Sequence, residues 1–147
     1  MRIIKYITLA LLVTVSLTAG AKNVKVPHVY MFGFAASFQD SIIYMTDIQD
    51  VQGAWMETKS KFLLGRDNYS YQLKNYLETQ EQPQRVCVVF FAKNRKKAEK
   101  MYVKLRKKYL PATNKKKGKK RQAPTLYDIR YITTQDFTFE PVDMAEE

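Results

Sequence analysis

Apolar residues in this chain fall into short runs of strand length and into longer stretches with helical spacing. HVYMFGF (28–34) and IIYMTDI (42–48) are rich in β-branched and aromatic residues, which favour strands. AASFQDS (35–41) separates them, so the pattern predicts a hairpin with a loop longer than the tight two-residue kind. RVCVVFFA (85–92) is almost continuously apolar, which indicates a strand covered on both faces or buried between elements.

Two stretches have the spacing of amphipathic helices. The first is predicted from Asp67, as cap, to about Gln80, with four apolar residues on one side: Tyr69, Leu73, Tyr76 and Leu77. The second is predicted over 94–110, with Asn94 as N-cap and Pro111 as the stop. Its apolar side contains Ala98, Met101, Tyr102, Leu105 and Tyr109.

The remaining segments complete a β-β-α-β-α-β order. LYDIRYIT (126–133) is the last predicted strand, and DFTFEP (136–141) is a candidate for a further one. Residues 50–65 predict an irregular piece that buries Trp55, Phe62 and Leu63. We expect an α+β fold, a two-layer sandwich in which two helices cover one face of a mixed sheet of four or five strands. Strands 85–92 and 126–133 should be parallel if they share that sheet.

The N-terminal residues have the layout of a cleavable signal peptide. Arg2 and Lys5 precede an apolar run over 7–17, and the small residues 19–21 follow it. This run is shorter than the roughly 20 apolar residues that span a membrane. We therefore expect removal of residues 1–21 by cleavage after Ala21, export to the periplasm or the medium, and no transmembrane segment in the mature chain. Residues 22–141 then form a single, monomeric domain with a frayed acidic tail at 142–147.

The net charge of +11 is distributed very unevenly. Fifteen Lys or Arg residues and one acid lie between Lys93 and Arg121, whereas the rest of the expected mature chain has eight bases and thirteen acids. On the second helix, five lysines recur at spacings of four and three and form a stripe facing solvent, here called the lysine stripe: Lys93, Lys97, Lys100, Lys104 and Lys107. Lys108 adjoins it. The loop 111–124, here called the basic loop, adds Lys115, Lys116, Lys117, Lys119, Lys120 and Arg121.

Several roles are open for this cationic feature. It can be a solvated surface that keeps the protein soluble, or the acidic tail can fold back onto it. It can also bind an anionic partner: anionic lipid, lipopolysaccharide, an anionic polysaccharide or an acidic protein. Sequence-specific recognition of nucleic acid is disfavoured, because the aromatic residues follow strand and helix-core patterns and are not interleaved with the lysines.

Residue types that carry catalysis or bind metals are scarce. The chain has one histidine, His28, and one cysteine, Cys87, so no internal disulfide or His-based zinc site is expected. Cys87 lies inside an apolar run, which favours a buried, inert thiol over a catalytic partner for His28. No glycine-rich phosphate loop or nucleophile elbow occurs, so neither a cofactor nor a metal is predicted.

Residues 85–132 resemble the second half of sporulation-related repeat domains. The shared features are Phe90 or Phe91 closing a strand, Ala98 and Glu99 in a helix, Leu105, and the following YDIRYI strand. The resemblance implies binding to the glycan of bacterial peptidoglycan, although this family has a helix where the chain offers only residues 35–41. More generally, the chain is similar to the small, exported, uncharacterised proteins of Gram-negative bacteria, which implies an envelope location.

From these patterns we expect an exported, non-catalytic protein that binds an anionic envelope component or an acidic partner. The alternatives are a cell-wall glycan-binding module and an unrecognised enzyme or enzyme inhibitor. Fold resemblance by itself does not decide among them.

Overall fold

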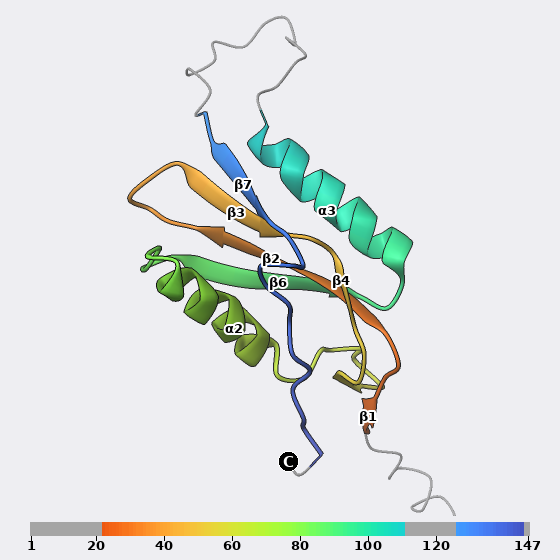
Figure 1. The fold of residues 1–147 in the computed structure, drawn as a ribbon. Helices are drawn as coiled ribbons and strands as arrows, with labels where there is room; N and C mark the ends of the chain where they lie inside the picture. The colour runs from red at the N-terminus through yellow and green to blue at the C-terminus, as the bar shows by residue number, and fades with distance from the viewer. Residues whose placement is uncertain (1–21, 111–125, 146–147) are drawn as a thin grey trace, which may run out of the picture.

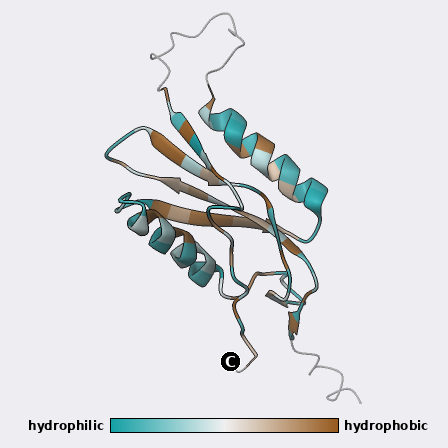
Figure 2. Cartoon of the chain, viewed as in Figure 1, coloured by the Kyte–Doolittle hydropathy of each residue, from teal (hydrophilic) through white to brown (hydrophobic). Residues whose placement is uncertain are grey.

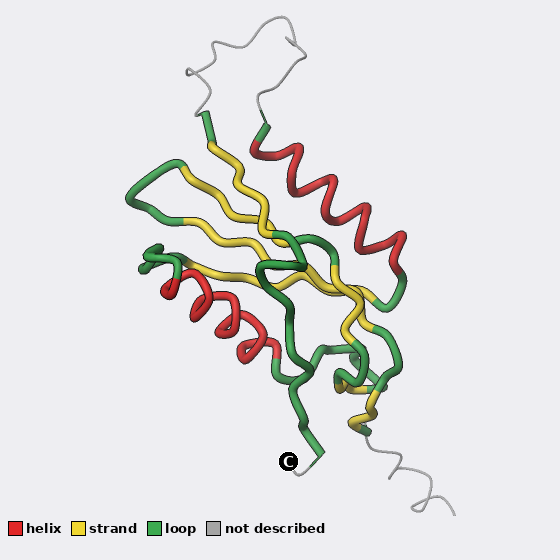
Figure 3. Tube along the Cα trace, viewed as in Figure 1, coloured by secondary structure: helices red, strands yellow, loops and turns green. Residues whose placement is uncertain are grey.

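The main sheet has five strands, and two helices pack against it (Figures 1 and 3). The computed structural model describes residues 22–110 and 126–145. The expected signal peptide with its cleavage site at Ala21, and the basic loop with its six bases, lie outside the described residues. The elements are β1 (Asn23–Lys25), β2 (Val29–Ala36), β3 (Ile42–Thr46), β4 (Gln49–Val51), β5 (Trp55–Glu57), α2 (Arg66–Thr79), β6 (Val86–Ala92), α3 (Arg95–Tyr109) and β7 (Asp128–Ile132).

Strand β2 is the centre of a mixed sheet. One of its edges pairs along its length with β6, and the other pairs with β4 and then with β3, all antiparallel. β3 pairs in parallel with β7. These directions make β6 and β7 parallel members of one sheet, as predicted. A separate two-stranded sheet joins β1 to β5, where the sequence predicted a polar lead-in and an irregular segment.

The α+β class, the mixed sheet and the two helices agree with the prediction, but the helices do not share a face of the sheet. On one side, Leu73 and Leu77 of α2 belong to the same buried cluster as Met31 and Val89. On the other side, Tyr102 of α3 packs edge-on against Phe32 at 5.1 Å between ring centroids. The reason is the apolar character of both faces of β2 and β6, each of which needs cover.

Gly33 explains how α2 comes so close to β2. A Cβ at this position would lie 2.5 Å from Leu73 Cδ2 and 3.3 Å from both Phe139 and Thr46. The Gly33 N–H donates to Thr46 Oγ1 at 2.8 Å, where β2 changes its pairing partner from β4 to β3. A residue without a side chain therefore permits the helix–sheet contact.

The segment predicted as an additional strand, 136–141, does not join the sheet but is held by side chains. Gln49 donates from Nε2 to the Phe137 carbonyl and accepts the Phe139 N–H at Oε1, at 3.0 and 2.8 Å. The Val142 N–H donates to the Tyr69 hydroxyl at 3.0 Å, so the predicted frayed tail is ordered at its beginning. This C-terminal segment completes the cover of the α2 face.

The predicted helix starts and the predicted burial of residues 50–65 are only partly confirmed. Asn94 caps α3 as predicted, because its side chain accepts the Lys96 N–H at 2.8 Å. Helix α2 instead begins after Gly65, whose φ of 70° lies in the left-handed region, and Asp67 lies within its first turn. Leu63 is buried and Trp55 partly so, but Phe62 is 50% exposed. Its neighbour Leu63 takes the inward position.

Candidate anion-binding surface

Helix α3 is fixed to the sheet by its aromatic and aliphatic side. Tyr109 packs against Phe34 at 5.2 Å between ring centroids, and Ala98 is fully buried. Met101 and Leu105 pack with them against the same cluster. Because side chains three and four positions apart share one side of a helix, this anchoring orients the opposite side toward solvent.

The lysine stripe lies on that opposite side as predicted. All five of its lysines, together with Lys96 and Lys108, are exposed. Figure 2 shows α3 as a largely hydrophilic helix beside a sheet that contains long hydrophobic stretches. Among the described residues, no carboxylate forms an ion pair with these lysines, and Glu99, the single acid of α3, pairs instead with Arg95 at 3.2 Å. The positive charge of the stripe is therefore not neutralised by the described part of the protein.

The order of charges along α3 is unfavourable at its beginning. Its first turn contains Arg95, Lys96 and Lys97 and no acid, although the N-terminal end of a helix dipole favours negative charge. In the last turn, the bases Arg106, Lys107 and Lys108 interact favourably with the negative end of the helix dipole. Bases thus occupy the whole length of the helix, including positions where they reduce its stability.

A shallow apolar hollow of about 480 Å³ lies among the lysines. Val103, 38% exposed, lines it together with Lys96, Glu99, Lys100, Lys104 and Lys107. Sequence reasoning missed Val103, although an apolar residue between Lys100 and Lys104 on the polar side was a visible signal. The surface can consequently contact apolar groups as well as anions.

His28 and Cys87 do not form a catalytic pair. His28 lies just before β2 and its Nδ1 is 2.9 Å from the Asp50 carboxylate. Cys87 is opposite Ala35, near the other end of β2, which places the two about 20 Å apart at the strand rise per residue. Cys87 lines a hollow of about 580 Å³ beside the start of α2. Burial raises the pKa of its thiol to about 11, so this sulfur is protonated and a poor nucleophile at neutral pH.

Within residues 22–110 and 126–145, no three His, Cys, Asp or Glu side chains come close enough together to hold a metal ion. The helices of this described part are too short or too polar to cross a bilayer.

Comparison with known proteins adds no assignment. No family model, curated protein or solved structure matches the chain.

Proposed function

We propose that this protein is exported and, without catalysing a reaction, binds an anionic envelope component or an acidic partner through the lysine stripe, Lys108 and the basic loop. The observation that carries the proposal is the exposed row of lysines that no described carboxylate neutralises. Clustered like charges repel each other, and a polyanion relieves that repulsion on binding. Lysine, a flexible point charge, suits loose attraction better than the forked geometry that arginine provides.

The bases in the first turn of α3 favour binding over simple solubility. A surface selected only for solubility would place acids near the start of the helix and bases near its end. Here Lys96 and Lys97 oppose the dipole. Retaining positive charge at that place is expected when a ligand, absent from the isolated chain, supplies the compensating negative charge.

The test is salt-dependent retention on immobilised heparin, used as a model polyanion. We expect the wild-type chain to be retained at low salt and released at moderate salt, because displaced counterions weaken such binding. Replacing Lys97, Lys100, Lys104 and Lys107 by Gln should move elution to markedly lower salt. A second variant with the six basic-loop residues changed to Ser measures the contribution of that loop.

A matched control separates a specific surface from net charge. Lys22, Lys59, Lys61 and Lys74 are exposed and lie outside α3, so changing them to Gln removes the same charge elsewhere. This control should elute close to wild type. Equal losses in both variants would contradict a defined binding surface, and salt-insensitive binding to isolated peptidoglycan would favour the glycan-binding alternative.

A further inference from the structure

The loop between β2 and β3 presents a completely exposed aromatic side chain. Phe38 is 99% exposed at the tip of residues 37–41. Figure 1 shows this loop projecting beyond the end of the sheet. One exposed apolar residue is ordinary on protein surfaces, so its meaning depends on how it is held and on what surrounds it.

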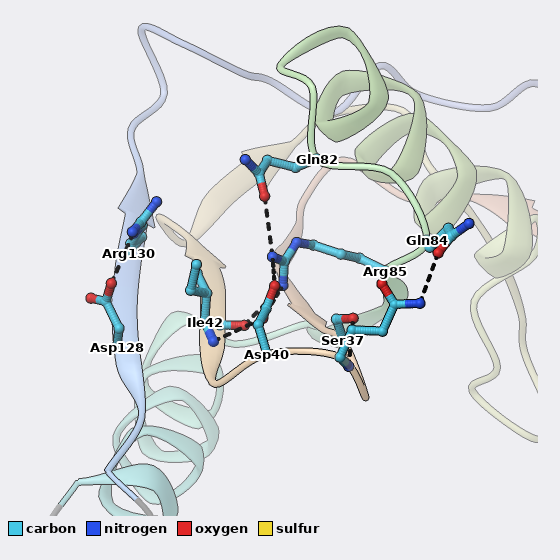
Figure 4. A network of polar contacts seen from close by, with 9 residues as sticks. Ser37, Asp40, Ile42, Gln82, Gln84, Arg85, Asp128 and Arg130 are labelled. Atoms are coloured by element: carbon cyan, nitrogen blue, oxygen red, sulfur yellow. Dashed lines mark hydrogen bonds and ion pairs between the residues drawn. The ribbon is translucent and has the colours of Figure 1, made fainter.

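The loop is fixed on the C-terminal side of Phe38 by a buried arginine (Figure 4). Arg85, with a side chain only 3% exposed, donates from Nη2 to Asp40 Oδ2 at 2.7 Å and from Nη1 to Asp40 Oδ1 at 3.2 Å. The same guanidinium donates to the Ile42 carbonyl at 2.9 Å and lies 4.9 Å from the ring centre of Tyr44. The Asp40 carboxylate also accepts the Ile42 N–H at 3.0 Å.

The residues next to Phe38 are held as well. Ser37 Oγ accepts the Gln39 N–H at 3.1 Å, and the Gln39 side chain donates to Gln84 Oε1 at 3.0 Å. Phe38 is thus exposed on an anchored loop and not on a frayed end. Because the loop backbone is already held in place, less backbone entropy is lost when Phe38 enters an apolar environment.

Other exposed apolar residues lie at the same end of the sheet. Val86 is opposite Ala36 at the end of β2, and Ile42 at the start of β3 is opposite Asp128. Tyr127, next to Asp128, packs edge-on against Tyr109 at 5.1 Å between ring centroids. This apolar end, as we call it, comprises Phe38, Val86, Leu110, Leu126 and Tyr127, each at least 40% exposed.

Positive charge borders the apolar end. Lys107 and Lys108 are exposed in the last turn of α3, and Lys108 Nζ lies 5.9 Å from the ring centre of Tyr109. Aromatic and aliphatic side chains bordered by lysines are the composition of surfaces that bind the interface of anionic membranes, where apolar groups enter the acyl region and lysines attract phosphates. A polysaccharide or an acidic protein would explain the lysines but offers no hydrocarbon layer for a projecting phenyl ring.

We propose that the apolar end docks on a bilayer of anionic phospholipid, with Phe38 inserted below the headgroups and Lys107 and Lys108 at the level of the phosphates. This inference rests on the proposed function, because it names the anionic component. The anchored loop acts as the apolar wedge and the lysine stripe supplies the long-range attraction. Docking in this way requires no transmembrane segment.

The first experiment is co-sedimentation with vesicles, using the chain from Lys22 onward, which contains every described contact. Vesicles of phosphatidylcholine and phosphatidylglycerol in equal parts should bind the protein, and vesicles of phosphatidylcholine alone should not. Phe38→Ser should weaken binding to the anionic vesicles roughly ten-fold or more, because the variant lacks the phenyl ring whose transfer from water into the bilayer favours binding. Its retention on heparin should not change. Phe62→Ser, which removes an exposed phenyl just before α2, is the matched control and should bind vesicles like wild type.

The second experiment reports insertion directly. Trp55 lies in the small sheet at the opposite end from the β2–β3 loop (Figure 1), and replacing it by Phe leaves a chain without tryptophan. In that background, Phe38→Trp should show a blue-shifted emission on anionic vesicles and quenching by lipids brominated along the acyl chain. Unchanged emission in the presence of bound vesicles would overturn the inference.

The two proposals fail in different ways. Retention on heparin without binding to anionic vesicles, or vesicle binding that Phe38→Ser leaves intact, overturns membrane docking and leaves the binding of anions in place. Failure of the wild-type chain on both heparin and anionic vesicles overturns both proposals.

Discussion

Arg85 is a charge in a buried position, and the residues that accept its hydrogen bonds determine what it stabilises. Its two terminal nitrogens donate to the Asp40 carboxylate, the Ile42 carbonyl and the Gln82 amide oxygen at 2.7 to 3.2 Å, whereas its buried Nε has no hydrogen-bond partner among the described residues. These partners lie on β3, on the loop before it and on the connection after α2. A single side chain therefore joins segments about forty residues apart in sequence.

The Arg85–Asp40 pair predicts a pH-dependent stability. The hydrogen bond from Arg85 and then the Ile42 N–H lower the pKa of Asp40 below its ordinary 3.8. A carboxyl with a lowered pKa in the folded state contributes stability above its ordinary value, and loses it as pH falls through the folded value. We expect Asp40→Asn to lower the Tm at pH 7 and to have progressively less effect below pH 3.8.

Thermal unfolding of wild type and Asp40→Asn, followed by circular dichroism at pH 7 and at pH 2, measures this pH dependence of the Tm difference. Glu81→Gln, at an exposed position on the α2–β6 connection, is the control and should leave Tm nearly unchanged. A difference between wild type and Asp40→Asn that is the same at pH 7 and at pH 2 would contradict the assignment.

Helix α3 is the element whose composition is least explained by stability. Its apolar side is sufficient to fix it on Phe32, Phe34 and Phe90. On its polar side the lysines repel one another. Bases also occupy its first turn, where the positive end of the helix dipole disfavours positive charge. The helix is therefore stabilised by packing and by its Asn94 cap, and its surface charge is available for another purpose.

This conflict predicts that a charge reversal stabilises the protein. Lys97→Glu should raise the free energy of unfolding by about 0.5 kcal/mol at low salt, because it removes repulsion, pairs with Lys93 and Lys100, and suits the helix N-terminus. Chemical denaturation measures the change. Lys104→Glu also introduces opposite-charge neighbours but lies near the other end, so it should stabilise less.

The gain from Lys97→Glu should shrink at high salt, as for any exposed charge interaction. The same variant should elute from heparin earlier than wild type. A destabilising Lys97→Glu, or a gain no larger than that of Lys104→Glu, would argue that the first turn of α3 carries no dipole penalty.

On the scale of the whole molecule, the two faces of the sheet depend on the same two strands. Met31 and Val89 face α2, whereas Phe32 and Phe90 face α3. The small sheet belongs to the same body, because Met56 and Leu63 are part of the buried cluster under α2. We expect one cooperative unfolding transition.

Leu73→Ala tests this coupling. Leu73 is fully buried against the face of Gly33, and the cavity should cost about 2–5 kcal/mol of unfolding free energy. Fluorescence of Trp55 and far-ultraviolet circular dichroism should shift together, with one midpoint. Tyr71→Ala, on the exposed side of the same helix, should change stability by less than about 1 kcal/mol. Separate midpoints for the two signals would show that the small sheet unfolds independently.

Periodicity along the chain was enough to predict the longer strands, the two helices and the exposed charge of α3, but not the small β1–β5 sheet. The apolar run 85–92, the cap at Asn94 and the outward placement of the lysine stripe all follow from spacing within one strand or helix. Such features depend on the fixed geometry of a regular backbone, so local sequence suffices to predict them.

Only the tertiary structure decided which segments meet. Three features join residues far apart in the chain. Helices α2 and α3 lie on opposite faces of the sheet, Gln49 forms hydrogen bonds with residues 137 and 139, and Arg85 anchors the Phe38 loop through Asp40. From the sequence, Phe38 was only one residue of a predicted loop. Its exposed position depends on hydrogen bonds that join Asp40 and Gln39 to residues of the α2–β6 connection, and the periodicity of the sequence does not predict such contacts. Spacing specifies which side of an element is apolar, whereas the neighbour that covers this side is chosen by packing of the whole chain.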